Sequence, residues 1–224
     1  MNAPRPLWVA VEGPAGAGKT YLSRLLARQY GARCALVDEI CNYGPDTLEG
    51  QVVSALTAAG DPFLRTGHPA AETLALLALK ARTWSAIRPE PVTRLVLEDR
   101  GPATVAACQA TVLHPSGTPA DLLRTARMIL SAAAWSRPLP DLNLLITDDP
   151  AVCERRFAAR TGCPVTPGMR SFTREALAVY EMLAQDDPAR WTVISRAGLS
   201  ADQVLAAMTG ACDAAAREPE RSCA

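Results

Sequence analysis

The sequence has few of the residues that build metal centres or disulfide frameworks. Histidine occurs only twice among its 224 residues, as His68 and His114. Neither histidine has a second ligand at a usual metal-binding spacing, so we expect no zinc site. The seven cysteines are odd in number, widely spaced and free of any C-x-x-C pair. This pattern favours reduced thiols and a cytoplasmic location over a disulfide framework.

Excess charge and long apolar runs are missing as well. The 23 basic residues balance 23 acidic ones, whereas a nucleic-acid-binding protein usually carries a basic excess, so we expect no nucleic-acid partner. No stretch approaches the roughly 18 consecutive apolar residues of a membrane span. The segment Met1–Leu7 also lacks the charged-then-apolar layout of a signal peptide. We therefore expect no association with a membrane.

What the chain does contain is a regular alternation of short apolar runs and helical patterns. The apolar runs are nearly continuous, as expected for strands that are covered on both faces. We predict strands at Leu7–Val11, Cys34–Val37, Leu95–Leu97, Leu142–Ile146 and Thr192–Ile194. We predict helices at Lys19–Tyr30, Thr47–Ala59, Ala70–Ile87, Ala103–Val112, Ala120–Ala134, Ala151–Arg160, Thr173–Gln185 and Ala201–Ala215.

This alternation predicts an α/β fold in which a five-stranded parallel sheet is flanked by helices on both faces. Thr118 with Asp121 and Ser200 with Gln203 have the spacing of capping boxes, which mark the starts of helices. The length suits one sizeable core. We therefore predict a single domain over residues 1–216, followed by a flexible tail over residues 217–224.

A glycine-rich loop joins the first predicted strand to the first predicted helix. Its sequence, GPAGAGKT over residues 13–20, matches the P-loop pattern in full. Backbone N–H groups must reach phosphate oxygens there without obstruction, which requires small residues: Gly13, Ala15, Gly16, Ala17 and Gly18. Lys19 would neutralise the β and γ phosphates, and the Thr20 hydroxyl would bind Mg²⁺. Because a strand precedes the loop and an amphipathic helix follows it, we predict a P-loop NTPase that binds ATP and Mg²⁺ rather than a flexible turn.

The third predicted strand is followed by two carboxylates and an arginine, Glu98, Asp99 and Arg100. At the carboxyl end of a strand beside the P-loop, Asp99 or Glu98 would hold Mg²⁺ through water. Arg100 would contact an anionic acceptor in the same crevice. Such residues also end strands in exposed salt-bridge clusters, and the P-loop favours the metal-binding interpretation.

Arginines gather in the segment 154–174, which we interpret as a lid. Arg156 and Arg160 lie one helical turn apart on one face, and Arg170 and Arg174 follow a segment with glycine and proline. A lid needs mobile cations that close over a γ-phosphate and expel water. A solvated basic helix face is the other interpretation of the same pattern.

Taken in their order along the chain, these motifs resemble the thymidylate kinase family and its deoxynucleoside kinase relatives. The resemblance extends from about Leu7 to about Met208 and rests chiefly on EGPAGAGKT, DRGPATVAACQ and ERRFAAR. Members of the family transfer the γ-phosphoryl group of ATP to a nucleotide or nucleoside, with Mg²⁺, on a five-stranded parallel sheet.

The resemblance also implies roles on the acceptor side. Asp99 and Arg100 would lie between donor and acceptor, and Gln109, nine residues after Arg100, would lie near the acceptor base. Lys80 or Arg82 would take the place of a basic residue on the acceptor-side helix. Relatives often pair through helices, so a homodimer is implied, with the apolar segment Leu74–Leu79 as interface unless it belongs to the core.

The chain departs from the thymidylate kinases just after the second strand, where they usually place an arginine. Asp38 and Glu39 stand there instead. Two carboxylates would repel a monophosphate, but one of them would serve as the base for an acceptor hydroxyl, as a glutamate does in deoxynucleoside kinases. An ordinary turn at the end of a strand is the other interpretation.

A second departure is the missing aromatic residue on the acceptor-side helix, where this chain has Leu76 or Ala78. A ring that stacks on the acceptor base would then have to come from Tyr43, Phe63 or Trp84.

We therefore predict an ATP-dependent small-molecule kinase with a nucleoside or nucleotide-like acceptor. The alternative is a P-loop ATPase or nucleotide switch that acts with a protein partner, although the absence of N-K-x-D argues against a GTPase. The residues predicted to carry catalysis are Lys19, Asp38, Glu39, Asp99, Arg100, Arg156 and Arg160.

Overall fold

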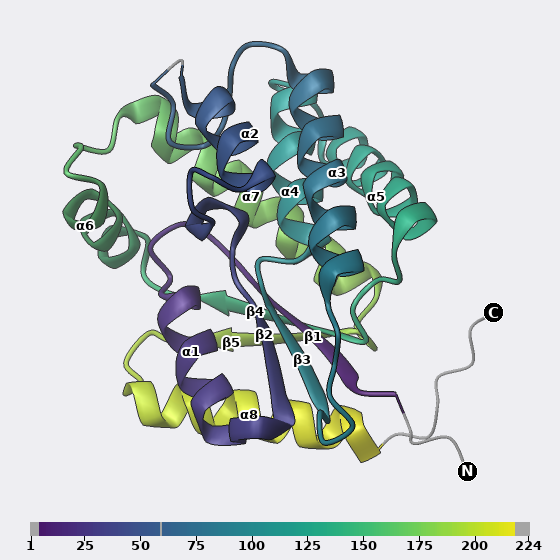
Figure 1. Cartoon of the computed structure of the whole chain (residues 1–224). Helices are drawn as coiled ribbons and strands as arrows, with labels where there is room; N and C mark the ends of the chain where they lie inside the picture. Colours follow the sequence, from purple (N-terminus) through teal and green to yellow (C-terminus); the bar gives the residue numbers. More distant parts are fainter. Residues whose placement is uncertain (1–4, 59, 218–224) are drawn as a thin grey trace.

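The computed structural model describes residues 5–58 and 60–217. Its centre is a sheet of five strands, all parallel, in the order β2-β3-β1-β4-β5 (Figure 1). The strands are β1 (Leu7–Glu12), β2 (Cys34–Val37), β3 (Leu95–Asp99), β4 (Leu142–Thr147) and β5 (Trp191–Ser195). The predicted α/β fold with a five-stranded parallel sheet is confirmed.

Eight α-helices lie within the described residues, and every predicted helix is present. They are α1 (Lys19–Tyr30), α2 (Leu48–Thr57), α3 (Pro69–Ala86), α4 (Pro102–Leu113), α5 (Pro119–Ser136), α6 (Pro150–Thr161), α7 (Pro167–Asp186) and α8 (Ala201–Arg217). Short 3₁₀ turns precede and follow β2, at Gly31–Arg33 and Ile40–Asn42.

The predicted helix starts are capped as their side chains suggest. Thr118 accepts a hydrogen bond from the backbone of Asp121, and Asp121 bonds back to the backbone N–H of Thr118, which forms a capping box at α5. Ser200 and Gln203 exchange the equivalent bonds at α8. These side chains supply partners for N–H groups that have none inside the helix.

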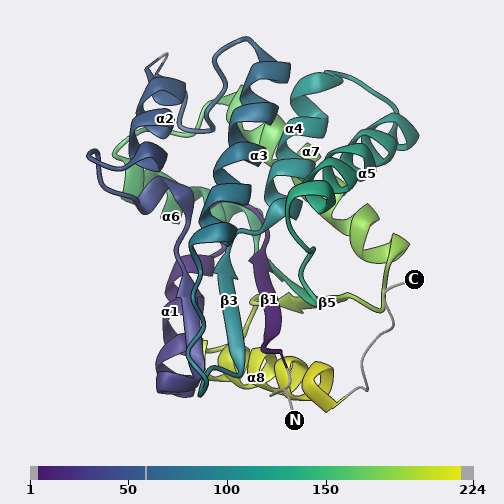
Figure 2. The ribbon, with the colours of Figure 1, turned by 45° about the vertical axis from the view of Figure 1, so that its right-hand side comes forward.

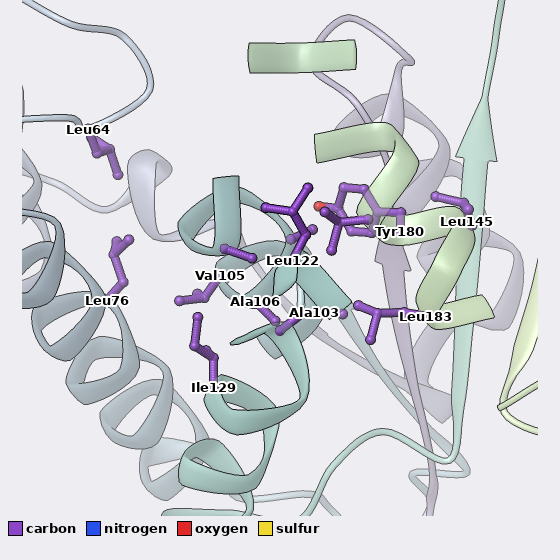
Figure 3. Packing of buried hydrophobic residues seen from close by; sticks show 14 of the residues in the cluster. Leu64, Leu76, Ala103, Val105, Ala106, Leu122, Ile129, Leu145, Tyr180 and Leu183 are labelled. Atoms are coloured by element: carbon purple, nitrogen blue, oxygen red, sulfur yellow. The ribbon is translucent and has the colours of Figure 1, made fainter. Parts of the chain in front are cut away.

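Helices cover both faces of the sheet, as Figures 1 and 2 show. The helices α1 and α8 pack on one face, and α3, α4, α5 and α7 pack on the other. The larger apolar cluster lies under this second group, where Tyr180 and Leu183 of α7 lie close to Leu145 of β4 (Figure 3). Burial of these side chains supplies the main stabilising free energy of the fold.

The strand register decides what lies at the carboxyl edge of the sheet. Val11 of β1 pairs with Asp99 of β3, and Val37 of β2 pairs with Glu98. The loops that follow β1, β2 and β3 therefore begin side by side, and this edge is where open α/β sheets bind their ligands.

The structure corrects the predicted start of helix α7, which lies within the segment predicted as a lid, and it describes only the first residue of the predicted tail. The lid itself stays a prediction. Helix α7 begins at Pro167, six residues before the predicted start at Thr173, because Thr166 caps it and Pro167 takes its first position. The lid segment 154–174 is thus mostly helical, with a short turn at 162–166. Arg217 is the last residue of α8, and 218–224 lie outside the described residues, as does the predicted helix end at Ala59.

The segment proposed as a dimer interface belongs partly to the core. Leu76 and Leu79 are buried, whereas Leu74 is 69% exposed on α3. The homodimer stays a prediction. Among the helices of residues 5–58 and 60–217, none has the length and apolar character needed to cross a bilayer.

Candidate active site

The glycine loop between β1 and α1 has the backbone conformation of a phosphate cradle. Gly13, Gly16 and Gly18 have φ angles of 131°, 83° and 85°, which only glycine adopts readily. A Cβ atom at residue 16 would overlap the backbone carbonyl of Cys153 in α6. The loop therefore requires glycine for conformation and for close packing, and it leads directly into the N-terminus of α1.

Lys19 is buried at the start of α1, where it is 3% exposed. Its Nζ donates a hydrogen bond to the backbone oxygen of Pro14 at 2.7 Å, so the side chain folds back over the loop. Burial lowers the pKa of Lys19 to about 7, and the nearby Arg100 acts in the same direction. An anion bound in the loop would reverse this effect by favouring the charged ammonium group.

A cavity of about 470 Å³ opens beside this loop and is called here the P-loop pocket. Gly16, Gly18 and Thr20 line it together with residues of α1 and the lid. Its charged lining residues are all cations: Lys19, Arg24, Arg28, Arg100, Arg156 and Arg160. Such a concentration of positive charge suits a polyanion such as a triphosphate.

Asp99 ends β3 next to the P-loop and is 1% exposed. Neither of its carboxylate oxygens has a hydrogen-bond partner among the described residues. Burial raises its pKa, and the charge of Glu39 adds to the rise. A buried carboxylate with unpartnered oxygens beside the Thr20 hydroxyl is the donor set that a hard cation such as Mg²⁺ prefers, so these two residues fit the predicted metal.

Glu98 lies on the opposite face of β3, because successive side chains of a strand alternate. Its carboxylate accepts hydrogen bonds from Arg137 at 3.0 and 2.8 Å, from Lys80 at 3.2 Å and from the indole of Trp8 at 3.2 Å. These donors occupy the oxygens that a metal would need. The prediction that Glu98 binds Mg²⁺ is therefore wrong, and Asp99 is the only one of the two acids aimed at the P-loop.

Arg100 connects the P-loop pocket to a second cavity. Its backbone is left-handed, with φ 65°, which is uncommon for a residue other than glycine. Its Nε lies 2.7 Å from Oε1 of Glu39. Burial alone would raise the pKa of Glu39, but the charges of Arg100 and Lys19 outweigh burial and hold it below the usual value.

This second cavity has a volume of about 320 Å³ and is called here the Glu39 pocket. Glu39, Lys80, Arg100, Arg160 and Gln109 supply charged or polar groups, so the predicted acceptor-side residue Lys80 lies at this pocket. The Thr73 hydroxyl lies 3.0 Å from the amide oxygen of Gln109. The remaining wall is largely apolar and includes Ile40, Phe63, Leu64, Leu76, Val105, Phe157 and Phe172. Phe63 and Phe157 stack with their ring centroids 5.3 Å apart.

The lid arginines behave differently from one another. Arg160 lines both pockets, and Arg156 lines the P-loop pocket, where it also pairs with Asp148 at 2.6 Å. Arg170 and Arg174 contribute to neither pocket, and Arg170 pairs with Glu154. The structure thus brings the first pair to the site and not the second.

Several predicted acceptor contacts lie away from the Glu39 pocket. Arg82 is exposed and pairs with Glu49 at 2.7 Å, and Asp38 faces Arg24 at 3.7 Å. Tyr43, one of the predicted stacking rings, lines neither pocket. Trp84, another, lines neither pocket and packs against Trp8 of β1. Of the three candidate stacking rings, only Phe63 lines the Glu39 pocket.

The sequence interpretation missed charged residues that the structure places at or near the site. Arg24 and Arg28 line the P-loop pocket, and their spacing of four and eight residues from Thr20 was a signal that they share its helix face. Glu12 is completely buried and accepts a 2.5 Å hydrogen bond from Thr104. Its signal was a lone carboxylate in an otherwise apolar strand.

Comparison with known proteins supports the fold. No protein-family model matches the chain, and no curated protein sequence is significantly similar to it. Its structure is similar to thymidylate kinase from Ehrlichia chaffeensis, with a TM-score of 0.63 and 18% identity over 94% of this chain and 99% of that one. It is also similar to thymidylate kinase from Candida albicans, with a TM-score of 0.67 and 17% identity over 94% and 92% of the two chains. The chain therefore has the fold of these two thymidylate kinases over 94% of its length.

Proposed function

We propose that this protein is an ATP-dependent kinase that phosphorylates a hydroxyl group of a nucleoside or nucleotide-like small molecule. The observation that carries the proposal is the pairing of two adjoining cavities that share Arg100 and Arg160. One is lined by cations alone among its charged residues, and the other has a carboxylate, Glu39, at the junction.

The P-loop pocket would take the triphosphate of ATP. The loop amides and the N-terminus of α1 would bind phosphate oxygens, and Lys19 would turn from the backbone oxygen of Pro14 toward them. Thr20 and Asp99 would hold Mg²⁺, which offsets phosphate charge when it is bound. Arg156 and Arg160 would neutralise the charge that moves toward the leaving oxygen during transfer.

Glu39 is the residue that favours a hydroxyl over a monophosphate as the acceptor group. It is 9% exposed, it lines the acceptor side of the junction, and its lowered pKa keeps it ionised at neutral pH. The acceptor oxygen would bond to the γ-phosphorus while its proton passes to Glu39, and ADP would leave with the oxygen of the broken bond. A dianionic phosphate would be repelled by the same carboxylate.

The apolar wall of the Glu39 pocket sets the kind of molecule that carries this hydroxyl. The rings of Phe63, Phe157 and Phe172 pack together at this wall and would pack against a planar group of the acceptor. The amide of Gln109 is held by the Thr73 hydroxyl at 3.0 Å, and the other end of the amide would contact a polar atom of the acceptor. A nucleobase or similar heterocycle attached to a hydroxylated sugar has both features.

The experiment is a screen of ATP consumption with Mg²⁺ across nucleosides and their monophosphates. We expect consumption that depends on a nucleoside-like acceptor and is lost in Lys19→Ala. Hydrolysis at a rate that no small acceptor changes would instead support the ATPase or switch alternative and would overturn the proposal.

A further inference from the structure

A group of buried charges beneath the site is not used by the proposed reaction. Glu98 is completely buried on the face of β3 away from the P-loop, and it accepts hydrogen bonds from Lys80, Arg137 and Trp8. Arg137 is itself 3% exposed, and its guanidinium lies over the rings of Trp8 and Trp84 at 4.7 and 5.2 Å. Glu98 is thus held on several sides and forms a rigid acceptor within the fold.

Lys80 connects this anchored carboxylate to the active site. It projects from α3, is 2% exposed, and donates to Glu98 at 3.2 Å. Its Nζ also donates to the backbone oxygen of Arg100. Because both bonds come from one buried ammonium group, the position of the Arg100 carbonyl is tied to that of Glu98.

Arg100 needs such a tie because its backbone is left-handed. At φ 65° its Cβ is crowded against its own backbone, and such conformations persist only where the surroundings determine them fully. Its N–H donates to the oxygen of Val11 at 3.1 Å, and its C=O accepts from Lys80. With both peptide groups held, the side chain is directed to Glu39 at the junction of the two pockets.

We propose that Lys80 and Glu98 are positioning residues that hold Arg100 in its left-handed conformation, and thereby place its guanidinium between the phosphoryl donor and Glu39. The catalytic part of this inference rests on the proposed kinase function; the structural part does not. Lys80 lines the Glu39 pocket, but its hydrogen bonds go to Glu98 and to the backbone oxygen of Arg100. In this proposal it acts through the peptide of Arg100 and not by contact with the acceptor.

The test is Lys80→Met, with Arg82→Met as its matched control. The first change removes the bonds to Glu98 and to the Arg100 carbonyl but leaves Glu98 paired with Arg137. The control removes a cation two residues along α3, Arg82, whose half-exposed side chain pairs with the buried carboxylate of Glu49 outside both pockets. We expect Lys80→Met to lower kcat about 100-fold, as misplacement of a catalytic group does. The acceptor KM and the affinity for ATP should change less than about threefold, and Arg82→Met should leave all these values unchanged.

A second readout needs no activity. The pKa of Glu39, followed by carbon-13 NMR of its carboxyl group, lies below its usual value while Arg100 faces it. In Lys80→Met this pKa should rise for two reasons: the charge of Lys80 itself no longer lowers it, and a displaced Arg100 offsets burial less well. In Arg82→Met it should stay as in the wild type. The position of Arg100 itself is read from its Nε–H signal, which should show nuclear Overhauser contacts to Glu39 in the wild type and in Arg82→Met and lose them in Lys80→Met. If the wild type phosphorylates no acceptor, the proposed function fails, yet these contacts still decide whether Lys80 positions Arg100.

Two results would overturn the inference. One is a Glu39 pKa that does not change in Lys80→Met, whatever happens to kcat. The other is a large rise in acceptor KM at constant kcat, which would mean that Lys80 binds the acceptor directly. If Lys80→Met does not fold, NMR of the Lys80 ammonium group in the wild type replaces it. We expect its protons to exchange slowly with water and to show nuclear Overhauser contacts to Gly101. Fast exchange without these contacts would refute the hydrogen bond from Lys80 to the Arg100 carbonyl.

Discussion

The P-loop pocket and the Glu39 pocket share Arg100 and Arg160 but differ in the balance of charge on their walls. In the P-loop pocket the charged lining residues are all cations, and most of the lining residues come from one loop and from helix α1. In the Glu39 pocket the cations are largely committed, Arg100 to Glu39 and Lys80 to Glu98. The comparison indicates that one pocket takes a highly charged group and the other takes a neutral group on an apolar body.

The largest expected effect comes from removing the cation that both the loop and the phosphates need. Lys19→Met should lower kcat by at least about 10³-fold, because the charge on the transferred group is then poorly neutralised. Its thermal unfolding should change little, since the variant no longer buries an ammonium group that prefers to be neutral. Turnover close to that of the wild type would remove the P-loop pocket from the mechanism.

An intermediate effect is expected at the Glu39 pocket. Glu39→Gln should lower kcat by about 10²-fold while the acceptor KM changes little, since a general base acts mainly in the transition state. Asp38→Asn is the matched control and should have almost no effect, because Asp38 faces Arg24 outside this pocket. Equal effects of the two changes on kcat would contradict the assignment of the base.

The smallest expected effect is the pH dependence of nucleotide binding in the P-loop pocket, which comes from the titration of Lys19. Free Lys19 has a pKa of about 7, lowered by burial, and bound phosphate should raise it. As the pH rises above 7, the free protein loses the proton that the complex retains, so affinity for a non-hydrolysable ATP analogue should fall up to about tenfold per pH unit. Calorimetry at pH 7.5 and 9 should show proton uptake of close to one, and Lys19→Met should show none.

The same contrast explains how much of the site the sequence predicts. The P-loop pocket is built largely from consecutive residues, so GPAGAGKT and the lid spacing of Arg156 and Arg160 were sufficient to find it. The Glu39 pocket collects side chains from the loop before α3 and from α3, α4, α6 and α7. No local spacing marks Phe63 as its ring or excludes Arg82, because those facts depend on how helices pack.

Two errors in the predicted ends of strands and helices have local physical reasons. The predicted third strand ended at Leu97, but the strand continues to Asp99, so Glu98 and Asp99 alternate between the two faces. With the strand predicted to end before these two residues, neither acid could be preferred as the metal ligand from the sequence. The start of α7 was also missed. Thr166 followed by Pro167 is a favourable helix start, but Gly168 in the first turn has a low helix propensity and made a loop the preferred prediction there.

The central claim is that the transferred phosphoryl group goes to a hydroxyl. Phosphorus-31 NMR of the product, with ATP, Mg²⁺ and an equimolar mixture of a nucleoside and its monophosphate, tests this claim directly because the two possible products have different phosphorus signals. We predict growth of a phosphomonoester signal from the nucleoside, lost in Glu39→Gln. Loss of the phosphomonoester signal of the monophosphate, with the nucleoside unchanged, would contradict the account; the diphosphate signal of ADP grows in either case.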